Sequence, residues 1–272
     1  MHHFKSITLG QYVGCIHNQY NYPVFLEQIA DCNSLLNQPE CRILLDSRNK
    51  IGSIKLKVEN DKYKEIVIKK FSSCGLNKIK SLFFPSKTAK SWRAANRLLE
   101  LEIPTSFPVA FLEKRDLGFL KEGFFITEEL NDVQEIRHLF RSSNFSHRMK
   151  QLISSLANYI IVCHKRGVLH LDLSDGNLLV SEEDGNFKFY LIDVNRIKFK
   201  RNIRLLSRIK NLIRLGIPPA YQKFFLKKYL GQEKLPKFYW WWYKINKNIY
   251  WQNIQIKKKL KLRKIARLLK IQ

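Results

Sequence analysis

Acidic residues are almost absent from the last quarter of this 272-residue chain. Residues 196–272 contain 23 Lys or Arg and one acid, Glu233, whereas the first 195 residues are close to balance, with 26 basic and 22 acidic side chains. So uneven a distribution predicts a partner with dense negative charge, either an anionic membrane surface or a nucleic acid. A merely solvated face is the alternative, but a balanced surface would serve solubility equally well.

Three other features are missing. The five cysteines form no C-x2-C pair, so the common zinc and redox motifs are excluded and free thiols are predicted. No run of about 20 uninterrupted apolar residues occurs, so we expect a cytoplasmic protein that is not integral to a membrane. Internal repeats and low-complexity linkers are also lacking, which favours one continuous folded chain.

Short runs rich in β-branched and aromatic residues dominate the first half. They predict an antiparallel meander followed by one helix that begins near Ser86 and ends before Pro104. The predicted strands are 41–46, 51–59, 65–71, 107–113 and 123–130.

The second half changes character. An apolar stripe at spacings of three and four predicts a helix over Met149–Lys165, and two short strands around Asp184-Gly185 predict a hairpin. From Asn195 onward the pattern is helical, apart from "GIPP" and an aromatic cluster at 238–251. The order predicts a two-lobed α+β fold, with a small antiparallel N-lobe that carries one helix and a mainly helical C-lobe.

Polar residues interrupt an apolar stretch between these elements. The segment "VLHLDLSDGNLLV" places Asp172 and Asn177 five residues apart, and Asp193 ends the next predicted strand. Buried carboxylates are costly unless they meet a cation, and Mg²⁺ with bound phosphates takes one or two protein oxygen ligands. Asn177 and Asp193 are therefore candidate metal ligands, and Asp172 is the candidate catalytic base. Lys69, on an earlier strand, can pair with phosphate oxygens.

Each of these residues also has a structural reading. Asp172 and Asn177 are common in turns, where their side chains cap backbone groups. His170 is expected to be a hydrogen-bonding core residue. Lys70 is a rival to Lys69, but strand alternation points it to the opposite face. The spacing of the whole set nevertheless favours catalysis.

The segments "KEIVIKKF", "CHKRGVLHLDLSDGNLLV" and "YLIDVNRIKF" resemble the bacterial lipopolysaccharide core kinase family of the Kdo/WaaP type, within the kinase-like superfamily. The resemblance implies a two-lobed protein-kinase-like fold that binds ATP and Mg²⁺ and phosphorylates a sugar hydroxyl of the lipopolysaccharide inner core. It divides the chain into an N-terminal extension (1–40), an N-lobe (41–130) and a basic C-lobe (131–272). Gly52 and Glu128, at the expected phosphate cover and the lobe junction, are the other candidate cofactor-binding residues.

Several departures from protein kinases are visible. No G-x-G-x-x-G precedes Lys69, the distal Asp is followed by "VN" rather than "FG", and no A-P-E follows, which disfavours a polypeptide substrate. Ser174 stands where protein Ser/Thr kinases usually have a Lys, so stabilisation of the transferred phosphoryl group must come from Lys69 and the metal. Glu100 is the candidate acid partner of Lys69, although it lies a turn late.

The basic C-terminal region sets the partners we expect. Basic and apolar residues alternate at near-helical spacing, and exposed aromatics at 238–251 would suit a membrane interface, although they would equally suit a core. The expected partners are a lipopolysaccharide core or another lipid-linked glycan and the anionic inner-membrane surface. Two alternatives stay open: a kinase-like phosphotransferase acting on another small molecule or a protein, and a catalytically weak kinase fold that binds nucleic acid.

Overall fold

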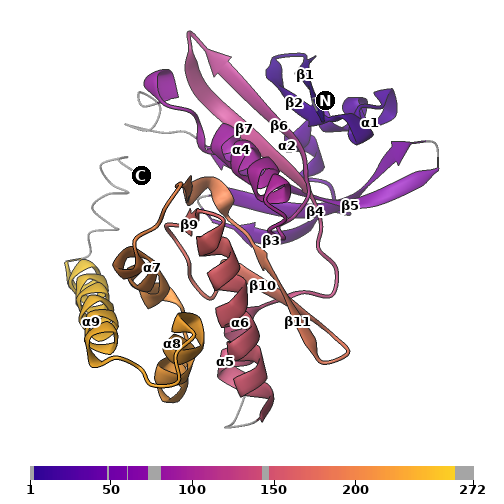
Figure 1. Ribbon diagram of the computed structural model, residues 1–272. Helices are drawn as coiled ribbons and strands as arrows, with labels where there is room; N and C mark the ends of the chain where they lie inside the picture. Colours follow the sequence, from indigo (N-terminus) through magenta and orange to yellow (C-terminus); the bar gives the residue numbers. More distant parts are fainter. Residues whose placement is uncertain (1–2, 48, 60, 73–80, 143–146, 261–272) are drawn as a thin grey trace. The chain divides into compact units, whose positions relative to one another are not determined.

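The computed structural model describes residues 3–47, 49–59, 61–72, 81–142 and 147–260. Contacts divide the chain into two compact units (Figure 1): unit 1 holds Met1–Glu100 and Ser106–Leu130, and unit 2 holds Leu101–Thr105 and the chain from Asn131 to the C-terminal helix. No helix within these described parts is both long enough and apolar enough to cross a membrane. Two expectations, the free thiol of Cys74 and the basic tail at 261–272, fall outside the described residues.

Unit 1 is built on an antiparallel sheet in which the described strands follow the order β1-β2-β6-β7-β5-β4-β3. Its strands are β1 (Phe4–Leu9), β2 (Tyr12–His17), β3 (Arg42–Asp46), β4 (Asn49–Glu59), β5 (Lys62–Ser72), β6 (Pro108–Asp116) and β7 (Phe119–Glu128). The five strands predicted from the sequence are β3 to β7. The hairpin β1–β2 was not predicted, and it extends the sheet beyond β6.

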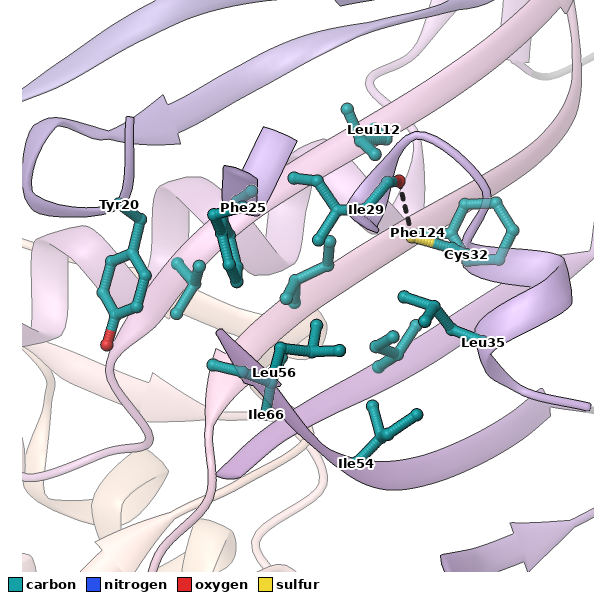
Figure 2. Packing of buried hydrophobic residues seen from close by; sticks show 14 of the residues in the cluster. Tyr20, Phe25, Ile29, Cys32, Leu35, Ile54, Leu56, Ile66, Leu112 and Phe124 are labelled. Atoms are coloured by element: carbon teal, nitrogen blue, oxygen red, sulfur yellow. Dashed lines mark hydrogen bonds between the residues drawn. The ribbon is translucent and has the colours of Figure 1, made fainter. Parts of the chain in front are cut away.

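Residues 1–40 form part of the core of unit 1. After the short 3-10 helix η1 (Asn18–Tyr20), the helices α1 (Pro23–Ile29) and α2 (Cys32–Leu35) lie over one face of the sheet. Figure 2 shows Phe25 and Ile29 packed with Leu56, Ile66 and Leu112, all at most 3% exposed. Burying such side chains contributes roughly 1.5–3 kcal/mol each. The segment expected to be an extension is thus integrated into this unit.

Helix α4 (Lys87–Glu100) lies on the other face of the sheet, against β6 and β7. Its start is capped as the sequence predicts, because the Ser86 hydroxyl accepts a 2.9 Å hydrogen bond from the amide of Ala89. Trp92 packs against Phe111 of β6 with ring centroids 5.7 Å apart. Gly123 allows α4 to approach the sheet closely, because a Cβ at this position would lie 2.4 Å from the Thr88 hydroxyl.

Unit 2 is mainly helical and is organised around α6 (His147–Lys165), against which α8 (Gln222–Leu230) and β11 (Asn186–Leu191) pack. The C-terminal helix α9 (Lys237–Lys259) lies beside α7 (Leu205–Asn211). The remaining described elements of this unit are α5 (Ile136–Ser142), β8 (Gln134–Glu135), β9 (Val168–His170), β10 (Leu178–Glu183), β12 (Ile197–Phe199), η2 (Val194–Arg196), η3 (Leu212–Arg214) and η4 (Pro219–Tyr221).

The predicted helix at 149–165 and the predicted hairpin are confirmed as α6 and β10–β11. The expectation that the aromatic cluster at 238–251 interrupts the helical pattern was wrong, because the whole cluster lies inside α9. Its members divide between two environments: Tyr243 is fully buried, whereas Trp241 and Trp251 are about half exposed. Helix propensity of aromatic residues is only modestly unfavourable, and packing of one face against α7 overrides it.

Candidate active site

The hairpin β10–β11 brings two of the predicted site residues together. Leu178 at the start of β10 pairs with Leu191 at the end of β11. One step further, the amide of Ile192 donates a 3.1 Å hydrogen bond to the carbonyl of Asn177. Asn177 and Asp193 therefore flank the open end of the same hairpin, although sixteen residues separate them in the sequence.

Asp172 joins this group through the side chain of Asn177. The Asn177 amide nitrogen donates a 2.8 Å hydrogen bond to the carbonyl oxygen of Asp172, so the side-chain oxygen of Asn177 is left for another partner. Asp193 adopts a left-handed backbone with φ of 55°, a conformation that Asp tolerates better than most residues. One of its carboxylate oxygens accepts a 3.1 Å bond from the side chain of Asn195.

His170 braces the loop that carries Asp172. Its Nδ1 accepts from the Asp172 amide at 3.1 Å, and its Nε2 lies 3.1 Å from the carbonyl of Ile192. Because a carbonyl only accepts, the proton must be on Nε2, and the ring is neutral. Burial lowers the pKa of His170 below its ordinary value. The sequence interpretation of His170 as a hydrogen-bonding core residue agrees with this geometry.

Two arginines that the sequence analysis did not single out hold the Asp172 carboxylate. Arg196 Nη1 lies 3.0 Å from Oδ2, and Arg214 Nη2 pairs with Oδ1. From Ser174 the sequence analysis inferred reliance on Lys69 and the metal, and it did not anticipate further cations beside Asp172. Arg214 lies 42 residues after Asp172 and carries no local motif, so only the fold could identify it.

The residues at the hairpin end fit a magnesium ion bound with phosphates. Asn177 and Asp193 offer an amide oxygen and a carboxylate, which are hard oxygen donors of the kind that Mg²⁺ prefers. A dedicated all-protein cage would need more ligands, and in the parts of the chain that the structure describes no three or more His, Cys, Asp or Glu side chains are arranged to hold a metal ion. Two protein ligands beside nucleotide phosphates and water match the donor set present.

The predicted phosphate anchor, Lys69, lies on β5 of unit 1, whereas Asp172, Asn177 and Asp193 all belong to unit 2. Lys69 shares a sheet face with Phe71, and its Nζ lies 5.1 Å from that ring. Phe71 pairs with Gly123, the residue that meets α4, so Lys69 is on the face that α4 covers.

The rival lysine is engaged elsewhere. Lys70 Nζ lies 2.9 Å from a carboxylate oxygen of Glu122 and 2.5 Å from the side-chain oxygen of Asn33 in α2. Tyr12 donates a 2.6 Å hydrogen bond to the same Glu122 carboxylate. This polar network ties β2, α2, β5 and β7 together on the face opposite Lys69, which leaves Lys69 as the candidate anchor.

The candidate acid partner from α4 has another contact. Glu100 pairs with Arg97 at 2.6 Å, and both side chains are more than half exposed. Glu100 is the single acid in the sequence of α4. Glu100 therefore lies on the exposed surface of α4, where it is paired with a residue one turn earlier.

Gly52 and Glu128 also have structural surroundings. Gly52 lies inside β4 rather than in a loop, and a Cβ there would meet the Cys41 sulfur at 2.5 Å and a Leu36 methyl at 2.9 Å. The Glu128 carboxylate accepts from the Tyr20 hydroxyl and lies 3.2 Å from Lys64 Nζ. Close packing therefore accounts for a glycine at position 52, and contacts with neighbouring polar side chains account for Glu128.

A match to a family model identifies the family of this chain. The model described as the lipopolysaccharide kinase (Kdo/WaaP) family matches residues 75–221, which include Asp172, Asn177, Asp193 and both arginines that hold Asp172. The chain belongs to this family. It is a kinase-type phosphotransferase, and its lipopolysaccharide kinase-like character follows from the same match.

Among solved structures, the chain is similar to one titled "WaaP in complex with acyl carrier protein", with 19% identity, a TM-score of 0.51 and coverage of 74% of this chain and 83% of that one. At this identity the likeness shows the protein-kinase-like fold. A complex of the Rio2 kinase from Chaetomium thermophilum with ADP/Mg²⁺-phosphoaspartate matches with 14% identity, a TM-score of 0.47 and coverage of 89% of this chain and 71% of that one. A search of curated proteins found no match.

Proposed function

We propose that this kinase transfers the γ-phosphoryl group of ATP to a sugar hydroxyl of the lipopolysaccharide inner core, on Kdo or heptose. The observation that carries the proposal is the convergence of Asp172, Asn177 and Asp193 at the open end of one hairpin, inside the segment that matches the family. Turn capping alone would explain any one of these residues. It does not by itself explain why a candidate base and two candidate oxygen ligands lie around the end of one hairpin.

The role of Asp172 is to accept a proton. As the acceptor hydroxyl loses its proton to the Asp172 carboxylate, its oxygen forms a bond to the γ-phosphorus, the bond from that phosphorus to the β,γ-bridging oxygen breaks, and ADP leaves. His170 holds the Asp172 backbone in place, and Asn177 links the base to the metal-binding end of the hairpin.

Asn177 and Asp193 would hold Mg²⁺, which neutralises charge on the nucleotide phosphates when bound. Lys69 of unit 1 would pair with phosphate oxygens of the donor. Gly52 is left out of the phosphate contacts, because its own packing accounts for it. Glu128 would contribute its backbone rather than its carboxylate to the nucleotide site.

The acceptor is proposed to reach the enzyme at the cytoplasmic face of the inner membrane. Helix α9 carries an exposed apolar stripe made of Phe238, Trp241, Ile249 and Ile256, each between 51% and 56% exposed. At 100° per residue these positions return to one side of the helix. Lysines flank the stripe at 237, 244 and 257–259. Apolar insertion with basic flanks favours an anionic bilayer over nucleic acid, which would not bury the stripe.

The test is transfer of labelled γ-phosphate from ATP to purified lipopolysaccharide core by the wild type, Asp172→Asn and Asp184→Asn. Asp184 lies in the exposed β10–β11 turn, so its change alters charge equally without touching the site. We expect a drop of about 100-fold or more for Asp172→Asn alone. Equal activity of all three proteins would refute the role of Asp172, and a wild type that turns over ATP but ignores this acceptor would refute the acceptor.

A further inference from the structure

The Asp172 carboxylate carries one guanidinium on each oxygen. Arg196 Nη1 lies 3.0 Å from Oδ2, and Arg214 Nη2 pairs with Oδ1. A hydroxyl that gives its proton to Asp172 must approach one of these oxygens. Each oxygen can accept a second hydrogen bond, but a guanidinium held on the same oxygen opposes its protonation, and the departure of one arginine would remove that opposition.

The two arginines are held very differently. Arg214 also donates a 3.4 Å bond to the carbonyl of Leu171, and its guanidinium carbon lies 5.3 Å from the ring centroid of Tyr250 in α9. Its side chain is 29% exposed, whereas that of Arg196 is 53% exposed. Arg214 is therefore the fixed partner, and Arg196 is the partner that can leave.

The main chain of Arg196 is nevertheless anchored beside the catalytic loop. Its carbonyl oxygen accepts a 3.1 Å hydrogen bond from the amide of Leu171, and the next residue, Ile197, pairs with His170. The backbone of Arg196 is thus fixed, while its half-exposed side chain has room to rotate away from Asp172. A guanidinium that leaves Oδ2 stays within a side-chain length of the reacting atoms.

The positive charge beside Asp172 favours the binding of a second anion. One carboxylate between two guanidiniums leaves a surplus of one positive charge, and a neutral hydroxyl that replaces Arg196 compensates none of it. Ser174 supplies no cation at the position where protein kinases usually carry a Lys. A guanidinium presents paired N–H donors that suit phosphoryl or carboxylate oxygens.

We propose that Arg196 is an oxyanion ligand of the reaction centre: it leaves Asp172 Oδ2 when the acceptor hydroxyl, or a water molecule in its place, arrives, and it binds an oxygen of the transferring phosphoryl group. This inference rests on the proposed phosphoryl transfer. An acidic group of the acceptor, phosphate or carboxylate, offers the same chemistry as a second source. Arg196 therefore first pairs with Asp172 in the absence of acceptor, and then stabilises the negative charge that develops on the transferring phosphoryl group.

The experiment compares Arg196→Ala and Arg196→Lys with Arg201→Ala, an equal charge change on an exposed residue of the same segment. Two rates are measured for each protein: phosphoryl transfer to lipopolysaccharide core, as kcat and KM, and ATP hydrolysis without acceptor. For Arg196→Ala we expect both rates to fall by about 100-fold. We expect partial recovery in Arg196→Lys, because the lysine ammonium keeps the positive charge but lacks the paired N–H donors of the guanidinium.

An increase in the acceptor KM of about 10-fold with ATP hydrolysis unchanged would also support an oxyanion ligand, and would place the anion on the acceptor. Rates equal to those of Arg201→Ala, or faster than wild type, would overturn the inference, since Arg196 would then be a surface charge or only a partner of Asp172. Failure of the proposed acceptor gives a different result: the wild type would hydrolyse ATP without transferring it, and the hydrolysis rate would still test Arg196.

Discussion

The guanidinium carbon of Arg214 lies 5.3 Å from the ring centroid of Tyr250. Through this contact the C-terminal helix α9 supports an arginine that touches the candidate base. A cation–π contact contributes about 0.5–2 kcal/mol. Losing it would let Arg214 move and would misorient Asp172.

We therefore predict that Tyr250→Ala lowers kcat for phosphoryl transfer by about 3- to 10-fold, with little change in the KM for ATP. Tyr250→Phe is the matched control, because it keeps the aromatic face and removes only the hydroxyl. Steady-state kinetics on the three proteins check this. If Tyr250→Phe were as slow as Tyr250→Ala, the ring contact would not be the cause.

A second prediction concerns pH and stability. His164 is 2% exposed, its Nδ1 lies 2.6 Å from the Tyr229 hydroxyl, and its Nε2 lies 3.1 Å from the side-chain oxygen of Asn211. Burial lowers the pKa of His164 to about 4. Below the unfolded value of about 6.5 the unfolded chain binds a proton that the folded chain rejects, so stability falls as the pH drops from about 6.5 to 4.

The loss should approach about 1.4 kcal/mol per pH unit for His164, and His170 acts in the same direction. Urea unfolding at pH 7, 6 and 5 measures it. The slope should shrink in His164→Gln and stay unchanged in His138→Gln, since His138 is exposed on α5. A wild-type stability that is flat between pH 7 and 5 would contradict the prediction.

A third prediction concerns the N-terminal hairpin. A Cβ on Gly14 would lie 1.8 Å from the carbonyl oxygen of Phe111, a backbone atom of the neighbouring strand β6. Backbone cannot move aside as a side-chain tip can, so Gly14→Ala should separate β2 from β6 and reduce the free energy of unfolding by about 2 kcal/mol or more.

Gly10→Ala is the comparison for that variant. Gly10 lies in the same hairpin with φ of 57°, and nothing lies within 4 Å of its Cβ position, so only conformational strain of about 1 kcal/mol is expected. Thermal or urea unfolding of both proteins decides the matter. Equal losses would mean that the close approach to Phe111 is not what makes Gly14 necessary.

A fourth prediction concerns α9 and lipid. The double change Trp241→Asp with Ile249→Asp should abolish cosedimentation with vesicles rich in anionic lipid. Asn253→Asp with Gln255→Asp adds the same charge at exposed polar positions of the helix and should weaken binding only modestly. Wild-type binding should decline with salt, because each basic residue near the surface contributes about 1 kcal/mol through screened attraction. Equal binding of both variants would show that charge alone holds the protein to lipid.

The sequence was most informative where local patterns decide structure. Strand alternation identified β3 to β7 and placed Lys69 and Lys70 on opposite faces, and the Asp184-Gly185 turn signalled the hairpin that aligns Asn177 with Asp193. It failed where tertiary contacts decide. Nothing local distinguishes Arg214 from the other basic residues that surround it, because its role comes from a contact with Tyr250, 36 residues further along the chain.

The aromatic cluster at 238–251 is a second case in which the sequence alone could not decide the structure. Its composition suited both a core and a membrane face, and the helix separates the two by direction: Tyr243 points inward, while Trp241, two residues earlier, is exposed. Residues 1–40 were expected to be an extension, and strand β2 was not predicted because Gly14 weakens the strand pattern. The reason for a glycine at this position is visible only in the structure, where it lies against Phe111.

The way in which β2 joins the sheet limits how this protein can be shortened. A chain that starts at Cys41 would leave β6 as a bare edge with unpaired amide and carbonyl groups, and would strip the cover of α1 and α2 from the apolar side chains of β4 and β5. Such a truncation keeps every proposed catalytic residue. It would nevertheless be expected to aggregate, so an inactive truncated protein would report on solubility and not on chemistry.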